Sequence, residues 1–271
     1  MTIFPNAKIN IGLWVTSRRD DGFHNIESIF YPVGIRDACE FVMQDNGIDS
    51  DEFTQTGIDS GSSINDNLVM KAINLVRSRF NIPALRVHLH KAIPIGAGLG
   101  GGSSDAAFML RYLNRYFRLG LCNEDLSAMA SELGSDCPFF IRNIPAYASG
   151  RGEILTKVSD LLAGLSIIIV NPGIILNTAE AYSELKPNKR DSSILDIYNL
   201  NIEEWKDKLE NDFEAGTFKK YPLIEEIKNE LYRQGAIYSS MSGSGSSVFG
   251  IFKDKPPLNI FNEYWRWYGS L

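Results

Sequence analysis

The chain has 271 residues, of which 44% are hydrophobic and 22% are charged. This composition is typical of a globular protein with a buried core, and it excludes a disordered chain, a collagen-like chain and a small disulfide-stabilised protein. Acidic residues outnumber basic residues by 33 to 27, which gives a net charge of −6 and argues against a general nucleic-acid-binding protein, because such proteins carry a basic excess.

The cysteines and the hydropathy pattern indicate an intracellular setting. Cys39, Cys122 and Cys137 are widely spaced and form no metal-binding pattern, so we expect three reduced thiols. There is no run of about 18 apolar residues, and residues 1–5 contain no secretory signal. We therefore expect a cytoplasmic protein without a membrane partner.

In chain order, the first elements are strands. Roughly alternating apolar residues predict strands at 9–15, 26–33 and 39–43. Residues 46–66 are polar and predict strands or loops at the surface, and residues 67–80 predict a helix with one apolar side.

The middle of the chain predicts a strand and two helices. Residues 86–90 alternate as a strand, and a glycine-rich segment follows. The first helix then has an apolar stripe and takes Ser103 or Ser104 as its N-cap. The second helix is capped by Asn123 and ends at Gly134.

The last part of the chain mixes both kinds of element. The pattern predicts strands at 165–170 and 248–252, and helices at 177–185, 202–209 and 223–234.

A polar, glycine-containing stretch at 146–158 predicts a boundary between an N-terminal domain, 1–155, and a C-terminal domain, 156–271. Strands and helices interleave without regular βαβ alternation, which favours the α+β class.

The most informative segment is the glycine-rich stretch 94–107. Five of the seven residues in 96–102 are glycines, and a helix follows. Glycines let backbone N–H groups approach a ligand closely, and a helix start adds unpaired donors and a partial positive charge. The alternative is a flexible turn between strand and helix, but five glycines exceed what a turn needs, so we favour a phosphate-binding loop.

Three well-known phosphate loops do not fit this segment. A Walker A loop requires a lysine before Ser103, and none is present. The dinucleotide-binding pattern matches literally, but residues 116–121 hold no strand that ends in an acid. A protein-kinase loop would be followed by a catalytic H-R-D motif, which is absent. The loop therefore depends on a cation from elsewhere in the chain.

Three other segments could supply the remaining chemistry. Lys8 and Asn10 lie on one face of a strand, although Lys8 could instead extend its ammonium to solvent and Asn10 could bond a loop. Asp136 follows a helix, where it could simply cap the next turn that contains Pro138. Residues 242–247 form a further glycine-serine loop, which is either a plain hairpin or a second backbone wall around phosphate.

Taken together, residues 5–13, 94–107 and 241–249 resemble the three ordered motifs of the GHMP kinase superfamily. The closest resemblance is to the kinases of 4-diphosphocytidyl-2-C-methyl-D-erythritol. It rests on Ala7-Lys8-Ile9-Asn10, Asp21-Gly22-Phe23-His24, Gly98–Ser104, Gly134–Phe140 and Asn211-Asp212-Phe213-Glu214.

This resemblance implies a two-lobed α+β fold with the active site in the cleft between the lobes. It also implies ATP-dependent phosphorylation of the 2-hydroxyl of the cytidyl substrate, a step of the non-mevalonate route to isoprenoid precursors. The expected partners are small molecules only, and the sequence does not reveal the oligomeric state.

The resemblance also assigns catalytic roles. Asp136 would accept the hydroxyl proton, Lys8 would hold that carboxylate ionised and stabilise the developing charge, and Asn10 would orient the acceptor. Asn67 and Lys91 would lie near the nucleotide. The residues expected around the ATP phosphates are Pro94, Gly96, Ala97, Gly98, Leu99, Gly100, Gly101, Gly102, Ser103 and Ser104. A serine hydroxyl of this loop, with Ser104 as the candidate, would meet Mg²⁺.

On the substrate side, His24 would read the cytosine edge, and Phe23 and Tyr182 would sandwich its ring. Thr178 would lie along the ribose. Gly243 and Ser244 complete the expected substrate site. Phe23 stands where the family often has tyrosine, so stacking survives but a hydroxyl contact is lost.

Two other interpretations stay open at this stage. A different GHMP kinase, acting on homoserine or a mevalonate, would have no use for the cytosine-binding residues. A non-catalytic ligand sensor on the same fold would not need both Lys8 and Asp136. A metal site at His88 and His90 is disfavoured because no third ligand accompanies them.

Overall fold

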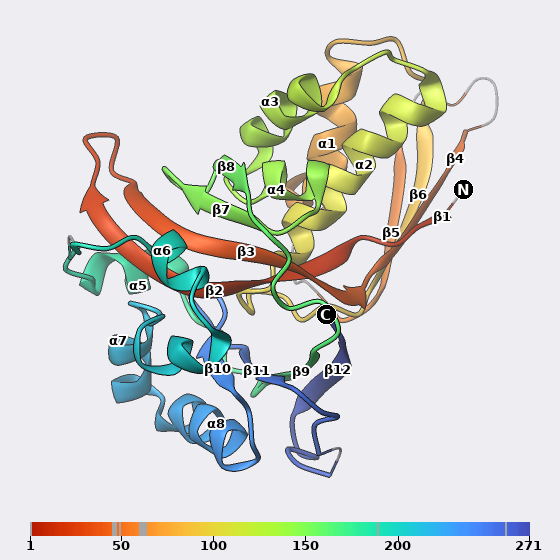
Figure 1. The fold of residues 1–271 in the computed structure, drawn as a ribbon. Coiled ribbons are helices and arrows are strands. Elements are labelled where there is room, and N and C mark those ends of the chain that lie inside the picture. The colour runs from red at the N-terminus through yellow and green to blue at the C-terminus, as the bar shows by residue number, and fades with distance from the viewer. Residues whose placement is uncertain (1, 45–47, 49, 60–63, 189, 258) are drawn as a thin grey trace. The chain divides into compact units, whose positions relative to one another are not determined.

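The computed structural model describes residues 2–44, 48, 50–59, 64–188, 190–257 and 259–271 (Figure 1). The chain packs into two compact units that interleave in sequence. Unit 1 comprises Met1–Ala7, Ile35–Ile95 and Gly100–Ile144, and unit 2 comprises Lys8–Gly34, Gly96–Leu99 and Pro145–Leu271. The domain boundary at residue 155 divides the chain by sequence order instead, and it remains a prediction.

Unit 1 contains a four-stranded sheet with the order β1-β4-β6-β5. The strands are β1 (Thr2–Ile3), β4 (Ala38–Met43), β5 (Glu52–Gly57) and β6 (Leu85–Lys91). Strand β6 pairs antiparallel with β4 and parallel with β5. Its Val87 and Leu89 are buried, so the inner face expected from the alternation is confirmed.

Helices gather on one side of this sheet (Figure 1). They are α1 (Leu68–Arg77), α2 (Gly101–Phe117), α3 (Asn123–Leu133) and α4 (Cys137–Arg142), preceded by the short 3-10 helix η1 (Ile64–Asp66). The apolar stripe of α2 is buried at Ala106, Met109, Leu110 and Leu113, as its spacing predicts.

Two predicted N-caps are wrong. Helix α2 begins after Gly100, whose φ of 69° is in the left-handed region that glycine adopts readily. The chain therefore enters the helix earlier than expected, and Ser103 and Ser104 lie inside its first turn. Asn123 is likewise the first residue of α3, which follows the N-cap Cys122.

Unit 2 is built around two antiparallel sheets. One has the order β2-β3-β7-β8 and the other β10-β11-β9-β12. The strands are β2 (Asn6–Arg18), β3 (His24–Arg36), β7 (Ala146–Ser149), β8 (Ile154–Lys157), β9 (Ser166–Asn171), β10 (Tyr238–Met241), β11 (Val248–Phe252) and β12 (Trp265–Ser270). The predicted strands at 9–15, 26–33, 165–170 and 248–252 are confirmed within these bounds.

Short helices complete unit 2. They are α5 (Thr178–Glu184), α6 (Ile194–Tyr198), η2 (Ile202–Asp207), α7 (Glu214–Lys220) and α8 (Pro222–Arg233). Helix α8 buries Ile224, Ile227 and Leu231 against β10 and β11, which confirms the helix predicted there. The helix predicted at 202–209 is a 3-10 helix that spans Ile202–Asp207.

The mixture of sheets and helices confirms the α+β class. Within the part of the chain that the structure describes, no helix is long and apolar enough to cross a membrane.

Candidate active site

Strand β2 presents Lys8 and Asn10 on one face, because side chains two residues apart in a strand point the same way. Lys8 Nζ donates to Asn10 Oδ1 at 2.5 Å and lies 4.7 Å from the centre of the Phe30 ring. Lys8 is 3% exposed, which excludes the alternative in which its ammonium extends into solvent. A buried ammonium costs several kcal/mol unless it is well bonded, so its presence here indicates a role beyond packing.

The first half of the glycine loop is tied to this strand. The backbone N–H of Lys8 donates to Leu99 O at 2.9 Å. The N–H of Asn10 donates to Ser242 Oγ at 3.2 Å, and Ser242 Oγ donates in turn to Gly98 O at 2.8 Å. These contacts join residues 91, 144 and 232 positions apart, so the three segments meet within unit 2, as the resemblance predicted.

The third loop, residues 242–247, packs directly on the glycine loop. Gly98 has a φ of 75°, and a Cβ there would lie 1.8 Å from Ser242 O. Ser247 N donates to Ala97 O at 3.2 Å. The loop joins β10 to β11 as a hairpin would, but it also supplies a second wall beside the glycine loop.

The second half of the glycine loop opens helix α2 in unit 1. The N-terminal turn of this helix, Gly101–Ser104, provides N–H groups and the positive end of the helix dipole. Ser104 Oγ is buried and has no hydrogen-bond partner among the described residues. This arrangement suits an anion at the helix start, with an unused hydroxyl beside it.

Lys91 is buried and contacts helix α2 through Asp105, so its ammonium does not lie at the protein surface. Its Nζ bonds Asp105 Oδ2 at 2.7 Å and also bonds Asp37. Burial acts to lower the pKa of Lys91, but the two carboxylates outweigh it and raise that pKa. For Asp105, burial dominates and raises the pKa from 3.8 to about 7. Lys91 thus anchors the segment that leads into the loop, and its contact with ATP remains a prediction.

Asn67 and Asp136, the other expected residues of unit 1, lie at helix starts. The side chain of Asn67 accepts from Val69 N at 2.9 Å and caps α1. Asp136 precedes α4 and Pro138, but its side chain makes no capping hydrogen bond. Helix capping therefore does not explain why an aspartate stands at position 136. The pairing of Asp136 with Lys8, which belongs to unit 2, remains a prediction.

A cavity of about 360 Å³ lies beside His24 and Tyr182 in unit 2. It is lined by Arg18, Gly22, His24, Ala179, Tyr182, Ser183, Leu185, Lys186 and Pro187. The His24 and Tyr182 rings stack with centres 5.1 Å apart and planes at 20°. Burial, followed by the charge of Arg18, lowers the pKa of His24, so its imidazole is neutral at pH 7 and offers one donor and one acceptor.

The structure does not bring Phe23 against Tyr182. Phe23 is 53% exposed, and the guanidinium of Arg151 lies 4.9 Å from its ring centre. The sandwich of a base between Phe23 and Tyr182 remains a prediction.

Thr178 and Ser244 do meet. Their hydroxyl oxygens lie 3.0 Å apart, which joins the start of α5 to the third loop. Asn177 caps α5 by accepting from Ala179 N and Glu180 N. The expected ribose and substrate residues are thus adjacent in unit 2.

The sequence interpretation overlooked Ser242 and Asn211 as site residues. Ser242 was visible as a polar residue inside the third loop. Asn211 belongs to a polar segment that resembles the family but carries no periodic signal. It is 3% exposed and bonds the carbonyls of Met241 and Gly243.

No cluster of three or more side chains suited to a metal ion occurs among the described His, Cys, Asp and Glu residues. His88 bonds Thr54 and Thr56, and His90 bonds Thr56, through their ring nitrogens.

Family models match both parts of the chain. The model described as GHMP kinases N terminal domain matches residues 67–143, and that described as GHMP kinases C terminal matches residues 194–267. The chain belongs to the GHMP kinases. Like its family, it is a small-molecule kinase that uses ATP as phosphoryl donor.

Two curated relatives of this GHMP kinase carry the same name. A protein of Parabacteroides distasonis is 48% identical over 100% of both chains, and one of Azobacteroides pseudotrichonymphae is 49% identical over 97% of both. Each is named 4-diphosphocytidyl-2-C-methyl-D-erythritol kinase.

Solved structures agree with this family. A 4-(cytidine 5'-diphospho)-2C-methyl-D-erythritol kinase is 31% identical, with a TM-score of 0.78 over 93% of this chain and 90% of its own. The Methanococcus jannaschii mevalonate kinase is 14% identical with a TM-score of 0.72 over 100% of this chain and 98% of its own, and it shares the fold.

Proposed function

We propose that this kinase transfers the γ-phosphoryl group of ATP to the 2-hydroxyl of 4-diphosphocytidyl-2-C-methyl-D-erythritol, in isoprenoid precursor biosynthesis. The observation that carries the substrate choice is the cavity beside His24 and Tyr182, in the same unit as Lys8 and Asn10. Its lining combines a neutral imidazole, an aromatic face and two cations, Arg18 and Lys186. Mevalonate and homoserine have no aromatic ring to occupy such a cavity, and the names of the relatives point to the same substrate.

The reaction requires positioning and charge stabilisation more than covalent chemistry. In the proposed mechanism, Asp136 accepts the proton of the 2-hydroxyl as the oxygen attacks the γ-phosphorus, and ADP leaves. Lys8 stabilises the negative charge on the transferring group, and Asn10 holds the Lys8 ammonium in place. The glycine-loop N–H groups hold the phosphates.

Mg²⁺ would accompany ATP in this mechanism. The buried hydroxyl of Ser104, which no described residue bonds, fits one ligand position at the start of α2. When bound, the ion would neutralise part of the negative charge of the phosphates.

The proposed function is tested by ADP release across four acceptors: the cytidyl substrate, mevalonate, homoserine and galactose. We expect ADP in equal amount to the cytidyl substrate, together with a new phosphomonoester signal in ³¹P NMR. Turnover of mevalonate or homoserine instead would support another GHMP kinase activity. Binding of the cytidyl compound without ADP release would support a sensor.

A further inference from the structure

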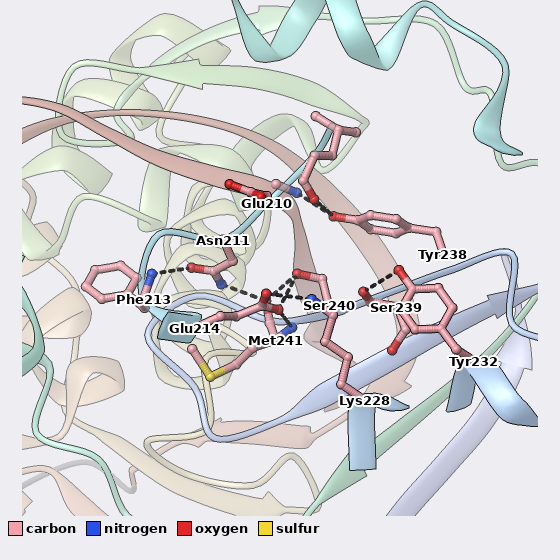
Figure 2. Close-up of polar contacts among 12 residues, drawn as sticks. Glu210, Asn211, Phe213, Glu214, Lys228, Tyr232, Tyr238, Ser239, Ser240 and Met241 are labelled. Carbon is pink, nitrogen blue, oxygen red and sulfur yellow. Dashed lines mark hydrogen bonds and ion pairs between the residues drawn. The ribbon is translucent and has the colours of Figure 1, made fainter. Parts of the chain in front are cut away.

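The side-chain amide of Asn211 is fully hydrogen-bonded, and Figure 2 shows its contacts with Phe213 and with Met241 at the end of β10. Its Nδ2 donates to Met241 O and to Gly243 O, each at 2.8 Å. Its Oδ1 accepts from Phe213 N at 3.0 Å. Only a primary amide supplies two donors and an acceptor in this arrangement, so no other side chain of this size could replace it.

Glu214 holds the end of β10, from which the third loop continues (Figure 2). Its Oε1 accepts from Met241 N at 2.8 Å and from Ser240 Oγ at 3.0 Å, while its Oε2 pairs with Lys228 at 2.6 Å. Both peptide groups of Met241 are therefore fixed by the segment 211–214.

This segment is itself fixed to β2, the strand that carries Lys8 and Asn10. Leu13 N donates to Glu210 O at 3.0 Å, and Asp212 N donates to Leu13 O at 2.8 Å. Tyr238 strengthens the attachment, because its hydroxyl donates to Leu209 O at 2.8 Å and accepts from Gly12 N. Asn211 thus lies between an anchored strand and the third loop.

The atoms that Asn211 holds lie next to the glycine loop. Ser242, between the two bonded carbonyls, bonds both Asn10 N and Gly98 O. A Cβ on Gly243 would lie 3.2 Å from Gly98 Cα and 3.4 Å from Asn10 Oδ1. A shift of the third loop would therefore disturb Gly98 and the partner of Lys8 at once.

We propose that Asn211 is a positioning residue for phosphoryl transfer, which fixes the third loop so that Gly98 and the Lys8–Asn10 pair keep their geometry. The inference rests on the proposed function of the same site. Asn211 acts through Met241 and Gly243, without contact with the reacting atoms.

The test is Asn211→Asp, which keeps the shape of the side chain. The substitution replaces the Nδ2 amide group, which donates two hydrogen bonds, with an oxygen that faces the carbonyls of Met241 and Gly243. We expect kcat to fall roughly 10- to 100-fold, because small displacements of reacting groups cost this much. The KM values for ATP and for the cytidyl substrate should change by a smaller factor than kcat, since Asn211 makes no contact with the His24 cavity lining and bonds only one residue, Gly243, of the expected substrate site.

The pH profile gives a second readout. Burial beside carbonyls raises the pKa of the introduced carboxyl, and its protonated form regains one donor. The wild-type kcat divided by the Asn211→Asp kcat should therefore fall toward 1 as the pH falls. Asn211→Ala has no such group, and its kcat ratio should stay constant with pH.

Asn114→Asp is the matched control. Asn114 also bonds backbone with its amide, donating to Leu121 O at 2.9 Å and accepting from Leu121 N at 3.0 Å, away from the third loop. All variants are assayed well below their melting temperatures, and kcat is expressed per folded protein. If Asn211→Asp does not fold, Asn211→Ala at reduced temperature carries the kcat comparison.

A wild-type kcat in folded Asn211 variants, even with a lowered melting temperature, would overturn the inference and show a structural role alone. An equal kcat loss in Asn114→Asp would overturn it as well. Failure of the proposed function is a separate result, since the wild-type protein would then release no ADP with the cytidyl substrate.

Discussion

Asp136 occupies the N-cap position of α4 without a side-chain capping bond. Aspartate at such a position normally accepts from the next turn and contributes about 1 kcal/mol to stability. Here that contribution is absent, which is consistent with a carboxylate retained for proton transfer.

We expect Asp136→Asn to lower kcat by roughly two to four orders of magnitude, because an amide cannot accept the hydroxyl proton. ADP release measures the loss, and thermal unfolding verifies that the variant is folded at the assay temperature. Near-normal turnover would remove Asp136 as the base.

His24 contributes one of the two stacked rings beside the cavity and remains neutral near pH 7. We expect His24→Ala to raise the KM for the cytidyl substrate by roughly 10- to 100-fold, equivalent to a lost stacking contact and hydrogen bond. The KM for ATP should stay within about twofold, because no residue of the glycine loop lines the cavity beside His24. Equal losses for both substrates would place His24 in a different role.

Among the elements, periodicity identified the long ones and missed several of the short ones. Strands β2 and β3 and helices α2 and α8 each present a repeating buried face, so their sequences carry a signal. Strands β10 and β7 and helix α6 span four or five residues and show no clear period, whereas the five-residue β11 was predicted from its apolar residues.

Two glycines of the glycine loop, Gly96 and Gly98, allow a substitution and its matched control to be compared. Gly96 and Gly98 both have positive φ, 63° and 75°, so alanine strains the backbone similarly at each. Only at Gly98 would the added Cβ meet another segment, at 1.8 Å from Ser242 O, whereas nothing lies within 4 Å at Gly96.

Gly98→Ala should therefore lower kcat by roughly tenfold or more beyond Gly96→Ala, because the clash moves the third loop. Steady-state kinetics on both variants, with circular dichroism to verify folding, make the comparison. Equal kcat values in the two variants would show that the contact between the loops does not matter for turnover.

For the whole molecule, the buried Asp37–Lys91–Asp105 cluster links stability to pH. The pKa of Asp105 is about 7 in the folded protein, above its ordinary value of 3.8. Between these values the folded state binds more protons than the unfolded state, so the contribution of Asp105 to stability falls as the pH rises toward 7 and is constant above it.

Asp105→Asn removes this titration. The free energy of unfolding of the variant minus that of wild type should increase by about 3 kcal/mol between pH 5 and pH 8, because only the wild type loses stability over this range. Urea unfolding at both pH values measures the difference. A pH-independent difference would show that Asp105 does not titrate in this range.

The sequence predicted much of the site because three motifs with recognisable chemistry occur in order. Lys8, Asn10, Gly98 and the third loop do meet, yet only the resemblance indicated that they would. Asn211 and Asp37 escaped prediction for a physical reason. Each acts through backbone or charge partners distant in sequence, and such pairings leave no local pattern.

Helix α5 carries Thr178 and Tyr182 but has no buried residue of its own. Amide protons in so exposed a helix open to deuterium with little cost, so exchange there should be fast in the ligand-free enzyme. A cytidine nucleotide in the adjoining cavity would contact Tyr182, stabilise the helix and slow that exchange. Deuterium uptake over residues 178–184 would then report the fraction of enzyme that has substrate bound.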